Sequence, residues 1–360
     1  MSFRQFIDRY ALIIAMSIGA AGYPWFHRLN GMMSPLIFLM LFFTFCKINP
    51  LDLRLRKWHW IVLAVQMMLT VVVYYGLLAI GDWLLAMGDG LLAMGDGLSK
   101  DDVALVAQGL MMCVIMPTAT AAPIIAGKLG GSIQNLTTFS LLSNIATAVI
   151  VPAFFPIVNP AAGIAFAPAM LQILKRIAPL LLGPFLAAWL LRLGVERYHR
   201  HRGEEKSFTL NKTWASMPFY LWVVLLIVLM GKITHTLVHQ EYSPWVIALL
   251  CAGALVTCAM QYLLGRWIGY HFPASSHGVD YQDITINPAA ANYSIQERSR
   301  ITAGQAFGQK NTALGIWMAQ MYLNPLSSIG PAAYIIWQNL INSYQLWKAG
   351  KGVRKTSPTK

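Results

Sequence analysis

The sequence contains few charged residues. Aspartate, glutamate, lysine and arginine make up only 11% of its 360 residues, whereas 57% are hydrophobic. A soluble globular domain carries about 25% charged residues, so the composition excludes an ordinary soluble domain. Several apolar runs reach about 20 residues, the length that crosses the hydrocarbon of a bilayer. The chain is therefore predicted to be an all-α polytopic membrane protein that is surrounded by lipid.

Cysteine is scarce as well. The four cysteines lie in or beside apolar runs, with no CxxC pair and no disulfide spacing; they are Cys46, Cys113, Cys251 and Cys258. We expect them to be small apolar residues of the interior. The phosphate-binding pattern GxxxxGK[ST] is missing too, which argues against coupling to ATP.

Acidic residues are outnumbered. Fourteen acidic residues stand against 27 basic ones, which gives a formal net charge of +13. In a soluble protein this excess would suggest a nucleic-acid partner, but in a membrane protein it is interpreted as loop charge that sets orientation. We therefore expect no nucleic-acid partner.

The apolar runs predict ten transmembrane helices. Their approximate bounds are 10–27, 31–47, 58–81, 103–127, 133–158, 170–193, 214–236, 244–270, 299–323 and 327–347. The first run follows Arg4 and Arg9 like a signal peptide, but the many later spans favour a first transmembrane helix.

Loop charge gives the orientation. The second loop, the sixth loop and the C-terminal tail are basic and lie on one side if there are ten spans, whereas the third loop is acidic. By the positive-inside rule both termini are cytoplasmic, in an integral, multi-pass protein of the cell (inner) membrane. The third loop also repeats Leu84–Gly90 as Leu91–Gly97, which we interpret as a tandem duplication in a tolerant surface loop.

Two of the predicted spans contain helix-breaking residues. Pro117 and Pro123 remove backbone donors from the fourth span, where Thr118 and Thr120 could bond the freed carbonyls. The ninth span contains Gly308-Gln309-Lys310-Asn311. Irregular backbone at membrane depth is tolerated only inside protein or beside a cavity, and interrupted spans at corresponding positions of two halves point to a transporter.

Lys310 is the least expected residue of the ninth span. An ammonium at the centre of a transmembrane helix costs about 2.5–3.5 kcal/mol on insertion scales. A snorkelling side chain is the alternative interpretation, but its distance from either end of the span makes that awkward. Lys128, at the end of the fourth span, is interpreted as a snorkelling residue.

These two spans resemble the bile acid:sodium symporter family. The family's ninth span has the pattern Glu-x-Gly-x-Gln-Asn-x-x-Leu-Ala, on which Gly308, Asn311 and Leu314 fall. Pro117 and Thr120 fall on the family's fourth-span crossover. The loop after the second span and the last span also resemble their counterparts in the family.

The resemblance implies a fold. It predicts two inverted five-helix repeats, residues 1–158 and 170–347, followed by a basic cytoplasmic tail, 348–360. Spans 1, 2, 6 and 7 would form a panel domain, and the other six would form a core. In the core, broken helices 4 and 9 would cross beside two sodium sites. Substrate would bind between the domains and move by alternating access.

The sequence departs from the family at the sodium ligands. The family's ninth-span glutamate falls on Ala306 and its glutamine on Lys310, while a fourth-span Ser-Asn pair falls on Ala122 and Pro123. A one-residue shift would place Gln305 at the glutamate position, still without a carboxylate. Sodium requires a site rich in hard oxygen ligands, so sodium coupling is doubtful and no metal ligands are predicted.

Lys310 could replace a sodium ion. In that interpretation its ammonium would bond to Gln66, the third-span glutamine that matches a family ligand, and to unwound carbonyls. If Lys310 exchanged its proton during the cycle, transport would be coupled to protons. If it stayed charged, it would be a permanent counter-ion that favours anions. The predicted substrate- or ion-binding residues are Gln66, Pro117, Thr118, Thr120, Pro123, Asn144, Gln305, Gln309, Lys310, Asn311 and Thr312.

The resulting prediction is a sodium-independent secondary transporter of a small organic anion, with no cofactor. The alternatives are a sodium-coupled bile-acid-type symporter and a non-transporting sensor that keeps the fold. An enzyme is not expected, because no carboxylate pair, histidine cluster or nucleophile stands at membrane depth. A metal site at the i,i+4 pair His235 and His239, and arsenite efflux through Cys113, are both disfavoured. The sequence leaves the identity of the anion, the direction of transport and the oligomeric state open.

Overall fold

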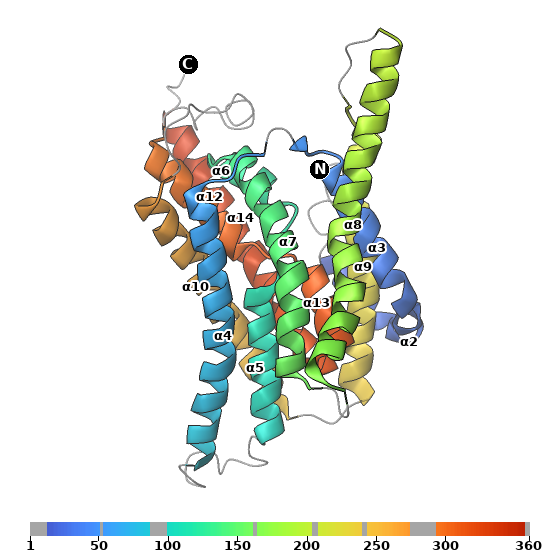
Figure 1. The fold of residues 1–360 in the computed structure, drawn as a ribbon. Coiled ribbons are helices and arrows are strands. Elements are labelled where there is room, and N and C mark those ends of the chain that lie inside the picture. The colour runs from blue at the N-terminus through green and yellow to red at the C-terminus, as the bar shows by residue number, and fades with distance from the viewer. Residues whose placement is uncertain are drawn as a thin grey trace. The chain divides into compact units, whose positions relative to one another are not determined.

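The computed structural model describes residues 13–50, 53–86, 99–160, 164–203, 208–239, 243–273 and 293–356 (Figure 1). Over these ranges the chain forms helices and turns with one isolated bridge and no strand, so the predicted all-α class is confirmed. Most of the LLAMGDG duplication and most of the polar segment 273–298 lie outside the described residues.

Contacts divide the chain into two compact units. The first contains residues 1–52, 148–242 and 316–326, and the second contains 53–147, 243–315 and 327–360. The first gathers predicted spans 1, 2, 6 and 7, and the second most of the other six. This membership follows the predicted panel and core, except that the ends of spans 5 and 9 go with the first unit.

The first unit is built around a short apolar helix. Its elements are a helical segment at 13–21, α2 (Tyr23–Phe26), the 3₁₀ helix η1 (His27–Met32), α3 (Met33–Phe45), α8 (Phe166–His201) and α9 (Lys212–His239). Helix α3 packs against both α8 and α9. Its sequence MSPLIFLMLFFTF is apolar almost all round, as expected for a helix with neighbours or lipid on every side.

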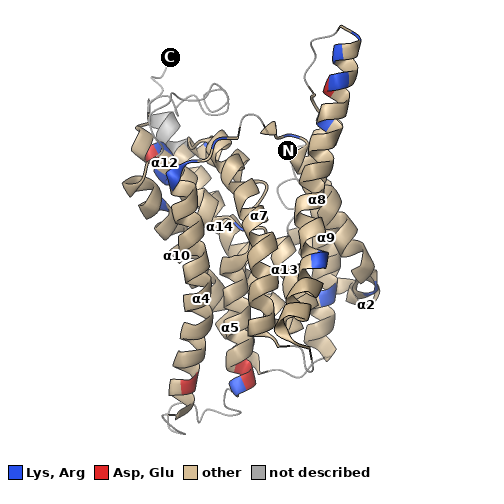
Figure 2. Ribbon diagram, in the orientation of Figure 1, with Lys and Arg blue, Asp and Glu red and all other residues tan. Residues whose placement is uncertain are grey.

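The second unit contains the interrupted helices. Its elements are α4 (Lys57–Ala86), α5 (Lys100–Ile115), α6 (Ala122–Leu129), most of α7 (Ile133–Val158), α10 (Pro244–His271), α12 (Ile295–Gly308), the start of α13 (Thr312–Tyr322), the end of the 3₁₀ helix η4 (Pro325–Ser328) and α14 (Ile329–Thr356). Charged residues of α4, α5 and α12 gather at the helix ends in Figure 2.

Helices α10 and α12 approach each other very closely. Glycines four residues apart face the contact from both helices, Gly265 and Gly269 from α10 and Gly304 and Gly308 from α12. A Cβ atom on Gly265 would lie 2.5 Å from the carbonyl oxygen of Ala303, and one on Gly308 would overlap the Tyr262 ring. Small residues at this spacing let helix backbones touch in a membrane.

Within the described residues, six helical segments are long and apolar enough to cross a membrane. Among them, α8 has 36 residues, or about 54 Å, whereas the hydrocarbon is about 30 Å thick. The helix continues to His201, beyond the predicted span 170–193, because the arginines that follow the apolar run do not end the helix. Helix α14 likewise continues through the first residues of the predicted tail. The ten-span topology and the inverted repeats stay predictions.

Candidate functional site

The two helix breaks of the second unit cross each other. Helix α5 ends before Pro117, and α12 ends before Lys310, so both predicted interruptions are confirmed. The two irregular segments run antiparallel, with an isolated bridge between Thr118 and Lys310. The amide of Ala119 donates to the Gln309 carbonyl at 2.9 Å, and the amide of Asn311 donates to the Pro117 carbonyl at 2.8 Å.

Lys310 lies inside this crossing. Its side chain is only 1% exposed, and its Nζ donates to the carbonyl oxygen of Val114 at 3.0 Å. The same ammonium lies 5.1 Å from the centre of the Phe307 ring, within the range of a cation–π contact. Val114 belongs to the last turn of α5, where unpaired carbonyls carry partial negative charge. Lys310 therefore places its amine at the C-terminal end of a half-helix.

Gln66 binds the same row of carbonyls. Its Nε2 donates to Val114 and Met116, both at 3.0 Å, and the residue is fully buried in α4. The prediction that Lys310 bonds directly to Gln66 is wrong, because Gln66 Oε1 has no partner among the described residues. The amide NH₂ and the ammonium are both donors, so they share the Val114 carbonyl instead of bonding to each other.

Three residues that the sequence did not identify also support the helix ends. The Tyr334 hydroxyl donates to the Gly308 carbonyl at 2.8 Å, and Gln261 Nε2 donates to the Cys113 carbonyl at 3.1 Å. These two side chains are 3.2 Å apart, which links the end of α12 to the end of α5. The third residue, Gln338, accepts a hydrogen bond from the Lys310 backbone amide at 3.0 Å. The only signal in the sequence was the presence of polar residues within apolar runs.

Thr118 and Thr120 have different environments. Thr118 Oγ1 donates to the Ala306 carbonyl at 2.7 Å, and its amide donates to Ser143 Oγ at 3.0 Å. Thr118 therefore satisfies a carbonyl of the ninth span, where we had expected it to bond the fourth. Thr120 is partly exposed, with no hydrogen bond to another described residue.

Asn311, Thr312 and Pro123 begin the second half of each broken helix. Asn311 Oδ1 accepts from the Leu314 amide at 3.3 Å, at the start of α13. The Thr312 amide donates to the Lys310 carbonyl at 3.0 Å. Pro123 stands in the first turn of α6, where its missing amide hydrogen leaves no bond unmade.

Asn144, Gln305 and Gln309 are also buried, but their side chains make no hydrogen bond to Lys310. Asn144 Nδ2 donates to the Ser140 carbonyl within α7 at 2.7 Å. Gln305 Nε2 donates to Gln345 Oε1 of α14 at 3.0 Å. Gln309 is 5% exposed and contributes its backbone carbonyl to the crossing.

Among the described residues, this unit offers buried oxygens but no buried carboxylate to a sodium ion. Side-chain oxygens of Gln66, Asn144, Thr147 and Gln309 are buried and have no partner among the described residues. However, the described carboxylates of this unit lie at helix ends, at Asp82, Asp101, Asp102 and Glu297. A site for a hard cation would have to form without a carboxylate and close to an ammonium.

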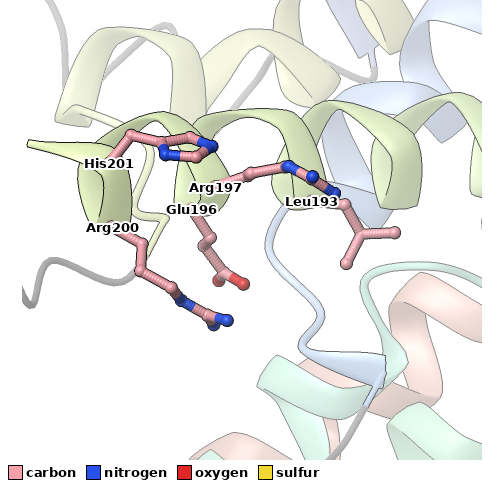
Figure 3. Close-up of a pocket in the computed structure, with 5 residues that line it drawn as sticks. All are labelled: Leu193, Glu196, Arg197, Arg200 and His201. Carbon is pink, nitrogen blue, oxygen red and sulfur yellow. The ribbon is translucent and has the colours of Figure 1, made fainter.

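A surface hollow on α8 contains none of the predicted site residues. It is lined by Leu193, Glu196, Arg197, Arg200 and His201, all on the C-terminal turns of that helix (Figure 3). Glu196 Oε1 also accepts from Arg192 Nη1 at 3.3 Å. The four cysteines are free thiols, as expected.

A family model, that of the SBF-like CPA transporter family, matches residues 11–340. No curated protein matches the chain.

Proposed function

The chain belongs to the SBF-like CPA transporter family, and on that premise we propose that it is a sodium-independent secondary transporter of a small organic anion. The family and the apolar helices make it an integral membrane transporter. The substrate class, the coupling and alternating access between ten spans are the proposed part. On loop charge, we place both termini in the cytoplasm, in the cell (inner) membrane.

The Lys310 ammonium carries the proposal. It donates to the last turn of α5, and half-helix C-terminal ends and unwound carbonyls are the groups that coordinate coupling cations in transporters with broken helices. In the family that this chain resembles, a sodium ion takes that role. A tethered ammonium would supply the same positive charge without an ion from solution.

The charge balance around Lys310 supports an anionic substrate. Among the described residues of the second unit, the carboxylates stand at helix ends, whereas Lys310 is buried at the crossing. An anion would compensate this charge at a lower cost than a neutral molecule would. A lysine that stays charged gives uniport, and one that exchanges its proton in each cycle gives proton coupling.

Sodium symport is the second candidate. The buried oxygens of Gln66, Asn144, Thr147 and Gln309 lack partners, and oxygen ligands of this kind suit a hard cation. The missing carboxylate and the nearby ammonium favour the sodium-independent mode.

Thermal unfolding in sodium chloride and in choline chloride, at equal ionic strength, separates the two modes. A ligand that binds only the folded state stabilises it by about 2.7 kcal/mol at one hundred times its dissociation constant. We expect equal melting temperatures in both salts. A sodium-specific rise would instead establish sodium binding and favour symport.

Transport itself is tested in proteoliposomes. The panel comprises bile-acid-like, keto-acid, sulfated-steroid and vitamin-type anions, each measured with and without a proton gradient. Uptake of at least one anion without sodium supports the proposal. Binding of an anion with no uptake would favour the sensor.

A further inference from the structure

Three histidine rings form a stack in the first unit. His27 begins η1, while His235 and His239 lie four residues apart in α9. The ring centres of His27 and His235 are 4.0 Å apart, with 20° between their planes. Those of His235 and His239 are 4.1 Å apart, with 15° between their planes. The sequence shows the pair on α9, but only the fold adds His27.

The stack continues a close helix contact to the end of α9. A Cβ atom on Gly19 would lie 2.5 Å from the Ile227 carbonyl oxygen, and one on Gly231 would lie 2.5 Å from Cβ of Phe26. The backbones of these segments therefore touch up to the residue before His27. Beyond that point, the described contact between η1 and α9 includes the imidazole stack.

Hydrogen bonds fix the tautomers of the two outer rings. His27 Nδ1 donates to the Tyr23 carbonyl at 2.8 Å, and His239 Nδ1 donates to the His235 carbonyl at 2.9 Å. In the neutral rings Nε2 therefore carries no hydrogen. No group of three His, Cys, Asp or Glu side chains within the described ranges is arranged to hold a metal ion.

Among the described residues, the surroundings of the stack offer no negative charge. The elements packed here are 13–21, α2, η1, α3 and α9. Their titratable or charged residues near the rings are Tyr23, His27, Arg28, Lys232, His235 and His239. None of these is a carboxylate, so a second proton on the stack would meet only neutral or positive groups of the described chain.

We propose that this stack is a proton-responsive contact, which holds α2 and η1 against the C-terminal end of α9 while its rings are neutral. Acidification places charges on neighbouring rings, and two like charges about 4 Å apart disfavour the closed contact by roughly tenfold or more. Separated rings bind more protons, so falling pH shifts the balance toward separation. Histidine side chains titrate between about pH 5 and 8.

Within this contact, η1 is the segment that we expect to open first. It consists of two short 3₁₀ turns joined across a kink at Leu29. The hydrogen-bond geometry of 3₁₀ turns is poorer than that of an α-helix. Loss of the ring contact would therefore free η1 and leave the long helices in place. This inference does not depend on which solute is transported.

Hydrogen exchange of the full-length protein in nanodiscs tests the proposal. Exchange of residues 22–32 is measured near pH 8 and near pH 5.5, the ends of the histidine range, and corrected for the intrinsic rate at each pH. We expect protection to fall by about tenfold or more at the lower pH. In His235→Gln, which removes the central ring, this pH response should vanish.

His271→Gln is the matched control. His271 Nδ1 makes the same kind of bond, to the Trp267 carbonyl at 2.9 Å, but the residue belongs to α10, so this variant should respond like wild type. Equal corrected exchange at both pH values in wild type, or a response that survives in His235→Gln, would overturn the proposal. If His235→Gln does not fold, His239→Gln should show a reduced response, and an unchanged response there would contradict it equally.

Discussion

The two units differ in where they place side chains that can carry a positive charge. In the second unit one ammonium, that of Lys310, is buried and bonded to the Val114 carbonyl. In the first, three imidazoles are stacked at the end of α9, where His239 is exposed. A buried cation persists only where the protein supplies an opposing dipole, whereas an accessible imidazole can gain and lose its proton. The comparison is therefore between a buried amine that is bonded to a helix end in one unit and a ring stack that reaches an exposed histidine in the other.

Replacing Lys310 should have the largest effect. We expect Lys310→Ala to abolish anion uptake, because the carbonyls at the end of α5 lose their cation, although membrane insertion should be normal. Uptake in proteoliposomes and the yield of folded protein are the two measurements. Lys128→Ala, at an exposed lysine in the last turn of α6, should transport like wild type. Full activity of Lys310→Ala would refute the role proposed for Lys310.

Overpacking the close contact between α10 and α12 should have the next largest effect. Gly308→Ala would drive a methyl group into the Tyr262 ring, and overpacking of this kind costs about 1–3 kcal/mol. The melting temperature should fall clearly. Gly76→Ala, where a Cβ meets nothing within 4 Å, should leave it unchanged or slightly raised. Equal melting temperatures for the two variants would mean that the α10–α12 contact is not tight.

Replacing Lys310 with a site for an exchangeable sodium ion would sharpen the comparison between the two units. In Ala306→Glu combined with Lys310→Gln, a carboxylate and a neutral amide stand where the resemblance places sodium ligands. We expect this variant alone to melt at a higher temperature in sodium than in choline chloride, with a stabilisation of about 2.7 kcal/mol when sodium is at one hundred times its dissociation constant. Lys310→Gln by itself, without the carboxylate, is the control. A sodium response already present in wild type would mean that Lys310 does not replace the ion.

The smallest difference should separate the two threonines of the fourth span. Thr118→Val removes the bond to the Ala306 carbonyl and leaves that buried acceptor unsatisfied, which costs about 1–3 kcal/mol. Thr120→Val removes no hydrogen bond between described residues and should stay within about 0.5 kcal/mol of wild type. The melting temperatures of Thr118→Val and Thr120→Val, measured side by side, test this difference. An equal loss in both would assign Thr120 a partner that the described residues do not include.

Both helix breaks could be located from the sequence. Pro117 and Pro123 cannot complete a helix, and a glycine beside a lysine marks the ninth span, so the interruptions were predicted where they occur. The end of α8 could not be located in this way, because apolar periodicity reports lipid contact and α8 continues as a helix after its apolar run ends.

The partners of Lys310 were only partly predictable. Unwound carbonyls were expected and found, but the carbonyl is that of Val114 and the bond to Gln66 is missing. Tyr334 and Gln261 were not identified, because a polar side chain in an apolar run does not show which carbonyl it will bond. Their roles depend on which carbonyls two other helices leave unpaired.

By itself, the sequence determined the membrane class, the positions of the breaks and the presence of a cation between them. Composition and helix-breaking residues act locally, so they can be recognised without knowledge of the neighbours. Only the tertiary structure decided that the breaks cross, that Gln66 and Lys310 share one carbonyl, and that His27 joins His235 and His239. Each of these depends on groups far apart in the chain that satisfy one another's hydrogen bonds or share a surface.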